Sequence, residues 1–318
     1  MASAGHTASD NDLLGRFGQV LERIERAAAR AGRRPQQVLL VAVTKYAEPD
    51  QILQLLQAGH RDFGENRVQQ LLQRASMLQE HSSRLRALGA ALGAARPDAD
   101  QPIRWHMIGQ LQKNKARQVA DACRLIHSVD SLRVAEELQE VGLKRDRPVE
   151  ILLQVNCSGE AGKAGCPSPA ALHMVEQIHS MIHLRLRGLM TMAPFGDDPQ
   201  DSRPTFARCR ELFEEIKAQG LVDESFNILS MGMSNDFEVA IEEGANMVRV
   251  GSAIFGEGQV ASAAAPSSEQ MGSVRTSEGQ ASDPSAASAP NPASASGRPL
   301  HDPHPAQDAQ QPTLPWPQ

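Results

Sequence analysis

Aromatic residues are scarce in this chain of 318 residues: they make up 3% of it, and Tyr46 is the single tyrosine. A hydrophobic core must therefore consist of Leu, Val, Ile, Met and Ala, and the hydrophobic fraction of 41% is sufficient for one large domain or two small ones. Basic residues are not in excess either, since the formal net charge is -6. This balance argues against broad binding to nucleic acid, which depends on a basic surface.

Cysteine motifs and long apolar runs are missing as well. The four cysteines (Cys123, Cys157, Cys166 and Cys209) form no C-x-x-C pair, which argues against a structural zinc site, a redox motif and an extracellular disulfide framework. The N-terminus, MASAGHTASDND, has no basic segment followed by an apolar one and predicts no secretory signal. No apolar run approaches the ~18 residues of a membrane span. We therefore expect a soluble, cytoplasmic protein without membrane contacts.

The composition changes near both ends of the chain. Residues 258–318 are rich in Ala, Ser, Pro and Gly, and they offer too little apolar area to offset the entropy of ordering. We predict a disordered tail there and a disordered N-terminus over residues 1–10; a partner motif in PTLPWPQ is an alternative for the tail. Residues 81–101, HSSRLRALGAALGAARPDADQ, are either an insertion or an extension of a helix. The remaining segment, 11–256, has the length of one domain.

Apolar runs of strand length alternate with segments of helical period along this domain. A first helix is predicted over residues 12–31, with Ser9 or Asp10 as its cap. The predicted strands follow at 38–44, 62–64, 104–108, 125–128, 149–155, 186–190, 227–230 and 247–250. About eight strands in strict alternation with helices favour an α/β fold, a single (β/α)8 TIM-type barrel. A doubly wound open sheet is the alternative, although no G-x-G-x-x-G follows the first strand.

Small and polar residues follow the predicted strands, and in a barrel these positions form the site. Lys45 ends the first strand, VLLVAVTK, where the alternative reading is a lysine that marks the emergence of the strand into water. SMGMS (230–234) and RVGSAIFG (249–256) follow the last two strands, where barrels often bind phosphate. SMGMS is alternatively an ordinary loop with a serine helix cap. Arg249, inside a strand, needs an acceptor, either a ligand or a carboxylate such as Glu65.

A lysine that faces a phosphate-binding loop and an inward arginine has a specific chemical interpretation. Lysine condenses with aldehydes to form a Schiff base, and pyridoxal 5'-phosphate (PLP) carries both an aldehyde and a phosphate. Arg249 would contact the pyridine nitrogen and, as a permanent donor, would keep that nitrogen unprotonated. The basic segment QLQKNKARQ (110–118) is another candidate for anion binding, with a solvated helix face as the alternative.

Several motifs, in order along the chain, resemble one known family: VAVTKY, FGENRVQQ, WHMIGQLQKNK, SVDS, VNCSGEAGKAG, LRGLMTMAPFGDD and LSMGMSNDFEVAIEEGANMVRVGSAIFG. Over residues 13–256 the chain resembles the pyridoxal phosphate homeostasis protein family. This resemblance implies a PLP fold-type III barrel like the N-terminal domain of alanine racemase, without the C-terminal β-domain of racemases. It also implies roles for individual residues: Lys45 forms the Schiff base, Arg249 contacts the pyridine nitrogen, Ser230, Met231, Gly251 and Ser252 hold the phosphate, and Asn66, His106 and Met190 line the pocket. Many relatives carry threonine in place of Ser252.

Whether such a site would catalyse a reaction depends on a second base. A racemase needs one base on each face of the substrate's α-carbon, and racemases of this fold take a tyrosine from the β-domain of a partner subunit. The segment after Gly256 is not expected to form such a domain, and strand alternation predicts that Tyr46 points away from Lys45. We therefore expect a monomeric, non-catalytic PLP carrier that serves PLP-dependent apo-enzymes. A low-activity amino-acid racemase or lyase is one alternative, and an interaction module that acts through the tail is another.

Overall fold

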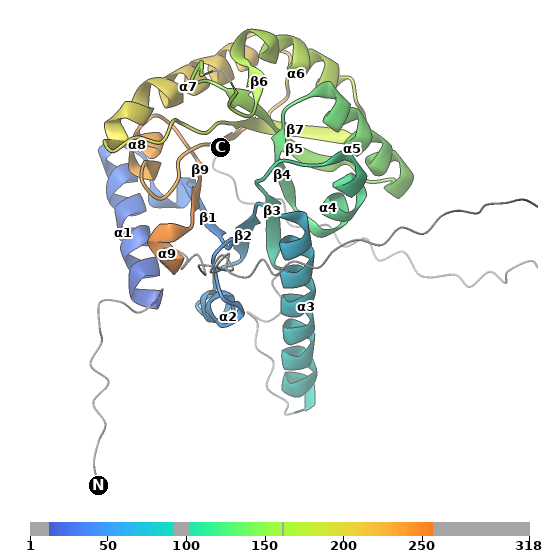
Figure 1. Ribbon diagram of the computed structural model, residues 1–318, viewed down its shortest axis with the longest axis vertical. Coiled ribbons are helices and arrows are strands. Elements are labelled where there is room, and N and C mark those ends of the chain that lie inside the picture. Colours follow the sequence, from blue (N-terminus) through green and yellow to red (C-terminus); the bar gives the residue numbers. More distant parts are fainter. Residues whose placement is uncertain (1–12, 92–101, 161, 257–318) are drawn as a thin grey trace, which may run out of the picture. The chain divides into compact units, whose positions relative to one another are not determined.

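Parallel strands form a closed ring in the part of the chain that the structure describes (Figure 1). The ring consists of β1 (Leu39–Val43), β2 (Asp62–Glu65), β3 (Arg104–Met107), β4 (Leu125–Val129), β5 (Val149–Asn156), β7 (Leu184–Met190), β8 (Ile228–Ser230) and β9 (Met247–Val250). Their order is β4-β3-β2-β1-β9-β8-β7-β5, and a pairing between β4 and β5 closes it. The two-residue strand β6 (Cys166–Pro167) adds only to β5. The predicted (β/α)8 barrel is thus confirmed, and ring closure excludes the doubly wound sheet.

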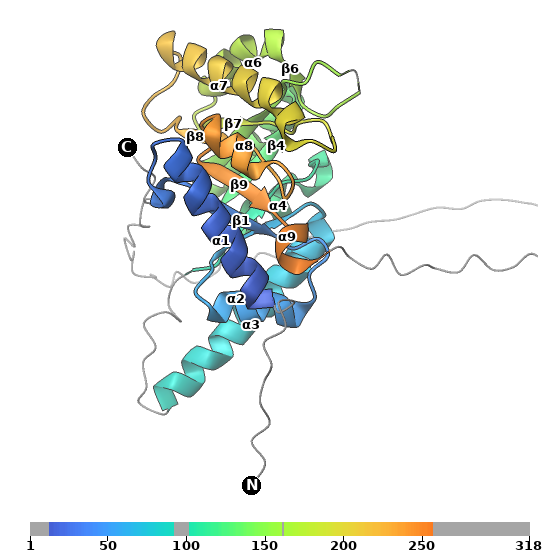
Figure 2. The same ribbon diagram turned by 90° about the vertical axis from the view of Figure 1, so that its left-hand side faces the viewer.

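Helices connect the successive strands and surround them (Figure 1). They are α1 (Leu13–Arg30), α2 (Pro49–Gln57), α3 (Val68–Ala91), α4 (Ala116–Ala122), α5 (Leu132–Arg145), α6 (Ala171–His179), α7 (Arg203–Ala218), α8 (Phe237–Glu242) and α9 (Ser252–Phe255). Helix α1 precedes β1 and packs against α8 and α9, the last two described helices in the sequence, as Figure 2 shows. Its buried residues Val20, Ile24 and Ala27 recur at helical spacing, so they lie on one face.

The structure, a computed structural model, describes residues 13–91, 102–160 and 162–256. The predicted disordered ends, 1–10 and 258–318, and the cap candidates Ser9 and Asp10 lie outside these ranges. Helix α3 continues as far as Ala91, so the first half of the 81–101 segment is helical, and residues 92–101 lie outside the described part. None of the described helices is long and apolar enough to cross a membrane.

The strands are buried on both faces, which explains why most of their residues are apolar. Alternate residues point inward, as Val41 of β1 does, and pack in a small cluster inside the barrel with Leu125, Leu152, Met190, Ile228 and Met247. The neighbours of Val41, Leu40 and Ala42, belong to the larger core between strands and helices. This period of two means that every second residue of each strand lines the barrel interior.

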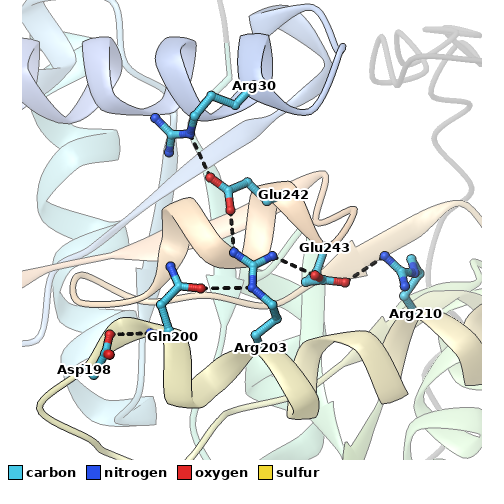
Figure 3. A network of polar contacts seen from close by, with 7 residues as sticks. All are labelled: Arg30, Asp198, Gln200, Arg203, Arg210, Glu242 and Glu243. Carbon is cyan, nitrogen blue, oxygen red and sulfur yellow. Dashed lines mark hydrogen bonds and ion pairs between the residues drawn. The ribbon is translucent and has the colours of Figure 1, made fainter.

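A network of charges on the outside of the barrel joins α1, α7 and α8 (Figure 3). At its centre the guanidinium of Arg203 pairs with Glu242 at 2.6 Å and Glu243 at 2.7 Å. Arg30 of α1 and Arg210 of α7 pair with the same two carboxylates. Both glutamates lie at the C-terminal end of α8, where the helix dipole disfavours negative charge. The three arginines offset that repulsion, and they fix α8 to its neighbours.

Candidate functional site

Lys45 lies in a tight turn just beyond β1. The strand ends at Val43, and a 2.8 Å hydrogen bond from the N–H of Ala47 to the carbonyl of Thr44 closes the turn. The side chain of Lys45 is exposed, and its Nζ lies 4.6 Å from the centre of the Tyr46 ring. The prediction that Tyr46 points away from Lys45 is therefore wrong, because the alternation of the strand stops two residues before the lysine.

Buried polar groups support this turn from beneath. The carboxylate of Glu65, at the end of β2, is fully buried and accepts hydrogen bonds from the Thr44 hydroxyl at 3.0 Å and the Asn66 N–H at 2.8 Å. The guanidinium of Arg74, on α3, pairs with the same carboxylate and donates a 2.9 Å bond to the carbonyl of Ala47. The position of Lys45 thus depends on an ion pair that the sequence analysis did not identify.

Arg249 lies inside the barrel and is 3% exposed. Its guanidinium donates to the hydroxyl of Ser230 at 2.7 Å and to the carbonyl of Thr191 at 2.9 Å. No carboxylate of the described residues lies within ion-pair distance of it, and the suggested partner Glu65 pairs with Arg74 instead. Burial lowers the pKa of Arg249 to about 10, against the stabilising charge of Asp236, so the group stays cationic at neutral pH.

The pairing of β1 with β9 places Lys45 and Arg249 on the same side of the sheet ring. Val41 pairs with Arg249 and Ala42 with Val250, so Lys45 lies beyond the level of Arg249 along the strand direction. Gly251 follows at the exit of β9, and a Cβ on it would lie 3.1 Å from the carbonyl oxygen of Val43. The exits of β1 and β9 are therefore in contact, with the arginine deeper in the barrel than the lysine.

The SMGMS loop after β8 is held by backbone and side-chain contacts. The N–H of Met231, whose side chain is buried, donates to the carbonyl of Met247 at 3.2 Å. Gly232 has a φ of +93°, and a Cβ there would lie 2.6 Å from the Cβ of Ala240, so only glycine fits. The hydroxyl of Ser234 accepts hydrogen bonds from the N–H groups of Gly251 at 3.1 Å and Ala253 at 3.3 Å. Ser234 is a serine helix cap, as the alternative suggested, but it caps α9 and not its own helix.

Ser252 and Ser230, both predicted to hold phosphate, occupy different environments. Ser252 is the first residue of α9 and is exposed, and the N–H groups of a first helical turn have no acceptor within their own helix. Ser230 is fully buried, and its hydroxyl accepts the bond from Arg249 and lies 3.1 Å from Nδ1 of His127. The structure directs this hydroxyl to the barrel interior, and its contact with a phosphate stays a prediction.

The three residues predicted to line the pocket also differ in burial: one is exposed and two are fully buried. Asn66 is exposed at the exit of β2, where its backbone leaves no space for a side chain at Gly109: a Cβ there would lie 2.1 Å from the Asn66 carbonyl oxygen. His106 and Met190 are fully buried inside the barrel. Met190 pairs with Ser230 across β7 and β8, which places it beside the Arg249 partner.

A line of buried polar side chains crosses the barrel interior beneath these exits. Nε2 of His106 lies 3.2 Å from a carboxylate oxygen of Asp62, and its Nδ1 lies 3.0 Å from Nε2 of His127. His127 in turn reaches Ser230. The guanidinium of Arg104 binds both oxygens of Asp62, at 2.7 and 2.5 Å. The sequence contained a signal for His127, since the alternation of LIHSV directs this residue inward with Leu125.

The remaining candidate groups lie apart from this site. All four cysteines are free thiols, and the described residues contain no cluster of three metal-ligating side chains. Burial raises the pKa of Cys166 to about 12, whereas a hydrogen bond from Cys209 lowers the pKa of Cys157 to about 7. In the segment 110–118, Lys113 lies in a turn of 3₁₀ helix, exposed and 3.9 Å from Glu137.

Comparison with known proteins connects this arrangement to a family. Residues 18–259 match the family described as alanine racemase, N-terminal domain. The pyridoxal phosphate homeostasis protein of Pseudomonas aeruginosa is 38% identical over 76% of this chain and 93% of its own length. That of Aquifex aeolicus is 36% identical over 76% and 96%. The solved structure of PipY of Synechococcus elongatus with PLP bound is 32% identical, with a TM-score of 0.60 over 75% of this chain and all of PipY.

Proposed function

Because the chain belongs to the family of pyridoxal phosphate homeostasis proteins, which have the alanine racemase N-terminal domain, we propose that it binds PLP at the C-terminal ends of its barrel strands. In this proposal the protein holds the cofactor for homeostasis or carriage and does not use it for catalysis. One observation carries the proposal: the turn that presents Lys45 adjoins the Gly251 exit, above a buried Arg249 that pairs with no carboxylate among the described residues. PipY, a relative with the same fold, was solved with PLP bound.

The donor groups fit a phosphorylated aldehyde. The amino nitrogen of Lys45 forms a C=N bond to the aldehyde carbon, and the aldehyde oxygen leaves as water. Arg249 supplies a buried cation and a permanent donor for the pyridine nitrogen, which makes the bound group a weaker electron sink than one paired with an acid. At the exit of β9, Ser252 offers its backbone N–H and its hydroxyl to the phosphate, and Gly251 lets the backbone approach closely, with its own N–H held by Ser234. Ser230 and Met231 lie at the end of β8, which pairs with β9, and the buried Ser230 hydroxyl supports the site through its bond from Arg249.

The three residues predicted to line the pocket lie at different depths, so they have different roles in this proposal. Asn66, exposed at the exit of β2, is linked to the turn of Lys45 through Glu65, which binds both the Thr44 hydroxyl and the Asn66 N–H. Met190 and His106 lie in the barrel interior, so they support the site from below rather than at its opening. Ser234 belongs to the site as well, because its hydroxyl positions the N–H groups of Gly251 and Ala253.

The contact between Lys45 and Tyr46 favours carriage over racemisation. A racemase needs two bases on opposite faces of its substrate, and the single tyrosine of the chain lies next to Lys45 in the same turn. Tyr46 is 52% exposed, and its ring contacts the ammonium group itself. A base that shares the turn of the lysine is not placed for the opposite face. A low-activity racemase or lyase is the competing function.

A first experiment tests the site. Purified protein is titrated with PLP, reduced with borohydride, digested and analysed by mass spectrometry. The modified peptide should carry the adduct on Lys45, and Lys45→Ala should abolish the adduct and the absorption of the bound cofactor. Lys113→Ala is the matched control, because Lys113 is an exposed lysine beyond the exit of β3, with β2 between that strand and β1, and the variant should bind like the wild type. An adduct on Lys113 or Lys115, or none, would show that the site assignment is wrong.

A second experiment separates the two functions. The PLP-loaded protein is incubated with L- and D-amino acids, and the enantiomer ratio and the keto-acid products are followed. Carriage predicts no turnover above that of free PLP and transfer of the cofactor to a PLP-dependent apo-enzyme, which regains its activity. Turnover that disappears in Lys45→Ala would establish the enzyme instead.

The proposal extends to the state of the protein in the cell. We place it in the cytoplasm as a monomer, with PLP-dependent apo-enzymes as its partners. Light scattering should give the mass of one chain both with and without PLP. A stable dimer would contradict this part of the proposal without affecting the cofactor site.

A further inference from the structure

Five inward-facing side chains from five different strands form one continuous line inside the barrel. Their order is Asp62 on β2, His106 on β3, His127 on β4, Ser230 on β8 and Arg249 on β9. Each is at most 3% exposed, so bulk solvent does not reach them. Successive polar atoms lie 2.7 to 3.2 Å apart, within hydrogen-bond distance. We call this the interior line.

The two ends of the interior line fix the direction of every hydrogen bond in it. Arg249 can only donate, so the Ser230 oxygen accepts from it, and the Ser230 proton is available to Nδ1 of His127. His127 then carries its proton on Nε2 and donates to Nδ1 of His106. His106 carries its proton on Nε2 and donates to Asp62, whose carboxylate can only accept. A neutral imidazole has one donor and one acceptor, so this arrangement satisfies both histidines completely.

Hydrogen bonds that run in the opposite direction along the interior line require an additional proton. His127 would donate from Nδ1 to Ser230, and His106 would donate from both nitrogens, which makes the pair cationic. Arg249, beyond Ser230, opposes that state, and Arg104 offsets the charge of the Asp62 carboxylate, which would favour it. Asp62 is the carboxylate that faces the line, and Asp236 and the thiol of Cys209 act on Arg249 from outside it. Burial, with the charge of Arg249, keeps the pKa of His127 well below its ordinary value, in agreement with a neutral His127.

Asp62 remains an anion at the far end. Burial acts to raise its pKa, but hydrogen bonds from Arg104 and His106 outweigh burial and hold the pKa well below its usual range. Arg104 closes the line, since its guanidinium binds both carboxylate oxygens. The line therefore runs from a fixed cation to a fixed anion, and both imidazoles between them are oriented by these ends.

We propose that His127 and His106 are positioning residues for the cofactor site, which hold the Ser230 hydroxyl as an acceptor for Arg249 and so fix the guanidinium that contacts the pyridine nitrogen. This inference rests on the proposed function for the identity of the ligand, whereas the direction of the hydrogen bonds is a property of the protein alone. Because Ser230 gives its proton to His127, its oxygen lone pairs remain available to Arg249. A line broken at His127 releases the Ser230 proton and loosens the orientation of the guanidinium.

The direction of the line is tested without any cofactor. Full-length protein with ¹⁵N-labelled histidine is examined at pH 7.5 by long-range ¹H–¹⁵N NMR, which distinguishes protonated from unprotonated imidazole nitrogens. His127→Gln and His106→Gln variants assign the two rings. We expect both rings to be neutral, with the proton on Nε2 and an acceptor at Nδ1. A proton on Nδ1 of either ring would overturn the proposal.

The effect on the site is tested with PLP-loaded protein. His127→Phe keeps the aromatic shape but removes both hydrogen bonds, whereas His127→Gln keeps a donor and an acceptor. We expect the Phe variant to shift the absorption of the bound cofactor and to lose PLP faster by about ten-fold, a magnitude typical of groups that orient a ligand-binding residue. The Gln variant should recover part of both changes. His60→Phe is the matched control, since His60 lies between Phe17 and Phe63 and bonds only to the backbone carbonyl of Asp62, which leaves the side-chain contacts of the line intact.

The outcomes separate the two proposals. If the wild type binds no PLP, the proposed function fails, and the NMR result alone decides the direction of the line. If the wild type binds PLP and His127→Phe has the same spectrum and the same rate of PLP loss, the positioning role is overturned. Equal changes in His127→Phe and His60→Phe would also overturn it, because they would reflect a general loss of stability. Circular dichroism confirms that each variant is folded before PLP is added.

Discussion

The guanidinium of Arg74 pairs with the fully buried carboxylate of Glu65, and it also donates a 2.9 Å hydrogen bond to the carbonyl of Ala47. One side chain on α3 thereby connects the end of β2 with the turn that carries Lys45. Because Arg74 is itself only 14% exposed, the pair is shielded from solvent. The helix that follows β2 thus determines the geometry at the exit of β1.

We predict that Arg74→Ala lowers the free energy of unfolding by about 3 kcal/mol, because Glu65 would remain as a buried charge without its partner. The variant should also lose PLP faster, since the turn around Lys45 would lose two of its contacts. Arg84→Ala is the matched control on the same helix: the Arg84–Glu80 pair is exposed, and its loss should change stability by less than about 0.5 kcal/mol. Urea denaturation measures both values, and equal effects would contradict the assigned role of Arg74.

A second prediction concerns Gly109 at the exit of β3. A Cβ at this position would lie 2.1 Å from the carbonyl oxygen and 2.7 Å from the carbonyl carbon of Asn66, which are backbone atoms that cannot rotate away. Gly109→Ala should therefore destabilise the protein by about 2 kcal/mol and disturb the exit of β2. Gly18→Ala serves as the control, because no atom lies within 4 Å of a Cβ there and alanine favours helix α1 by about 0.5–1 kcal/mol. Thermal unfolding should show shifts of opposite sign.

Stability should fall in mild acid because of His127. Its folded-state pKa lies below the ordinary value, so below about pH 6.5 the unfolded chain binds a proton that the folded chain does not. The contribution of His127 to the free energy of unfolding is then constant above this pH and falls by about 1.4 kcal/mol per pH unit below it. Urea titrations at pH 7.5, 6.5 and 5.5 measure the slope, which should be shallower in His127→Gln. His60, whose pKa burial also lowers, contributes the remaining slope, whereas a variant of the exposed His173 should match the wild type.

The charge network of Figure 3 gives a further prediction. Arg203→Ala removes the contacts to Glu242 and Glu243 and leaves two carboxylates at the C-terminal end of α8 with fewer partners. The loss of stability should be about 1 kcal/mol, because the arginine is 36% exposed and solvent screens it. The difference from the wild type should shrink in 1 M salt. Lys144→Ala, which breaks the exposed pair with Glu140, should have no measurable effect at either salt concentration.

The sequence by itself determined the order of the elements. The predicted strand positions agree with the observed strands to within two residues at each end, because strands buried on both faces are mostly apolar. The small and polar residues after each strand, including Lys45, Gly251 and Ser252, indicated one functional end of the barrel. Arg249 was recognised as an inward residue from its position in an otherwise apolar strand.

Only the tertiary structure decided which side chains meet across strands. The partners of Arg249 come from positions that are remote in sequence, Ser230 and Thr191, and the expected partner Glu65 is bound by Arg74. Alternation along a strand specifies the face of a residue but not its neighbour, which depends on the register of the closed ring. For the same reason the line from Asp62 to Arg249 was not visible in the sequence. The turn at Lys45 lies beyond the last residue of β1, where the period of two no longer predicts a direction.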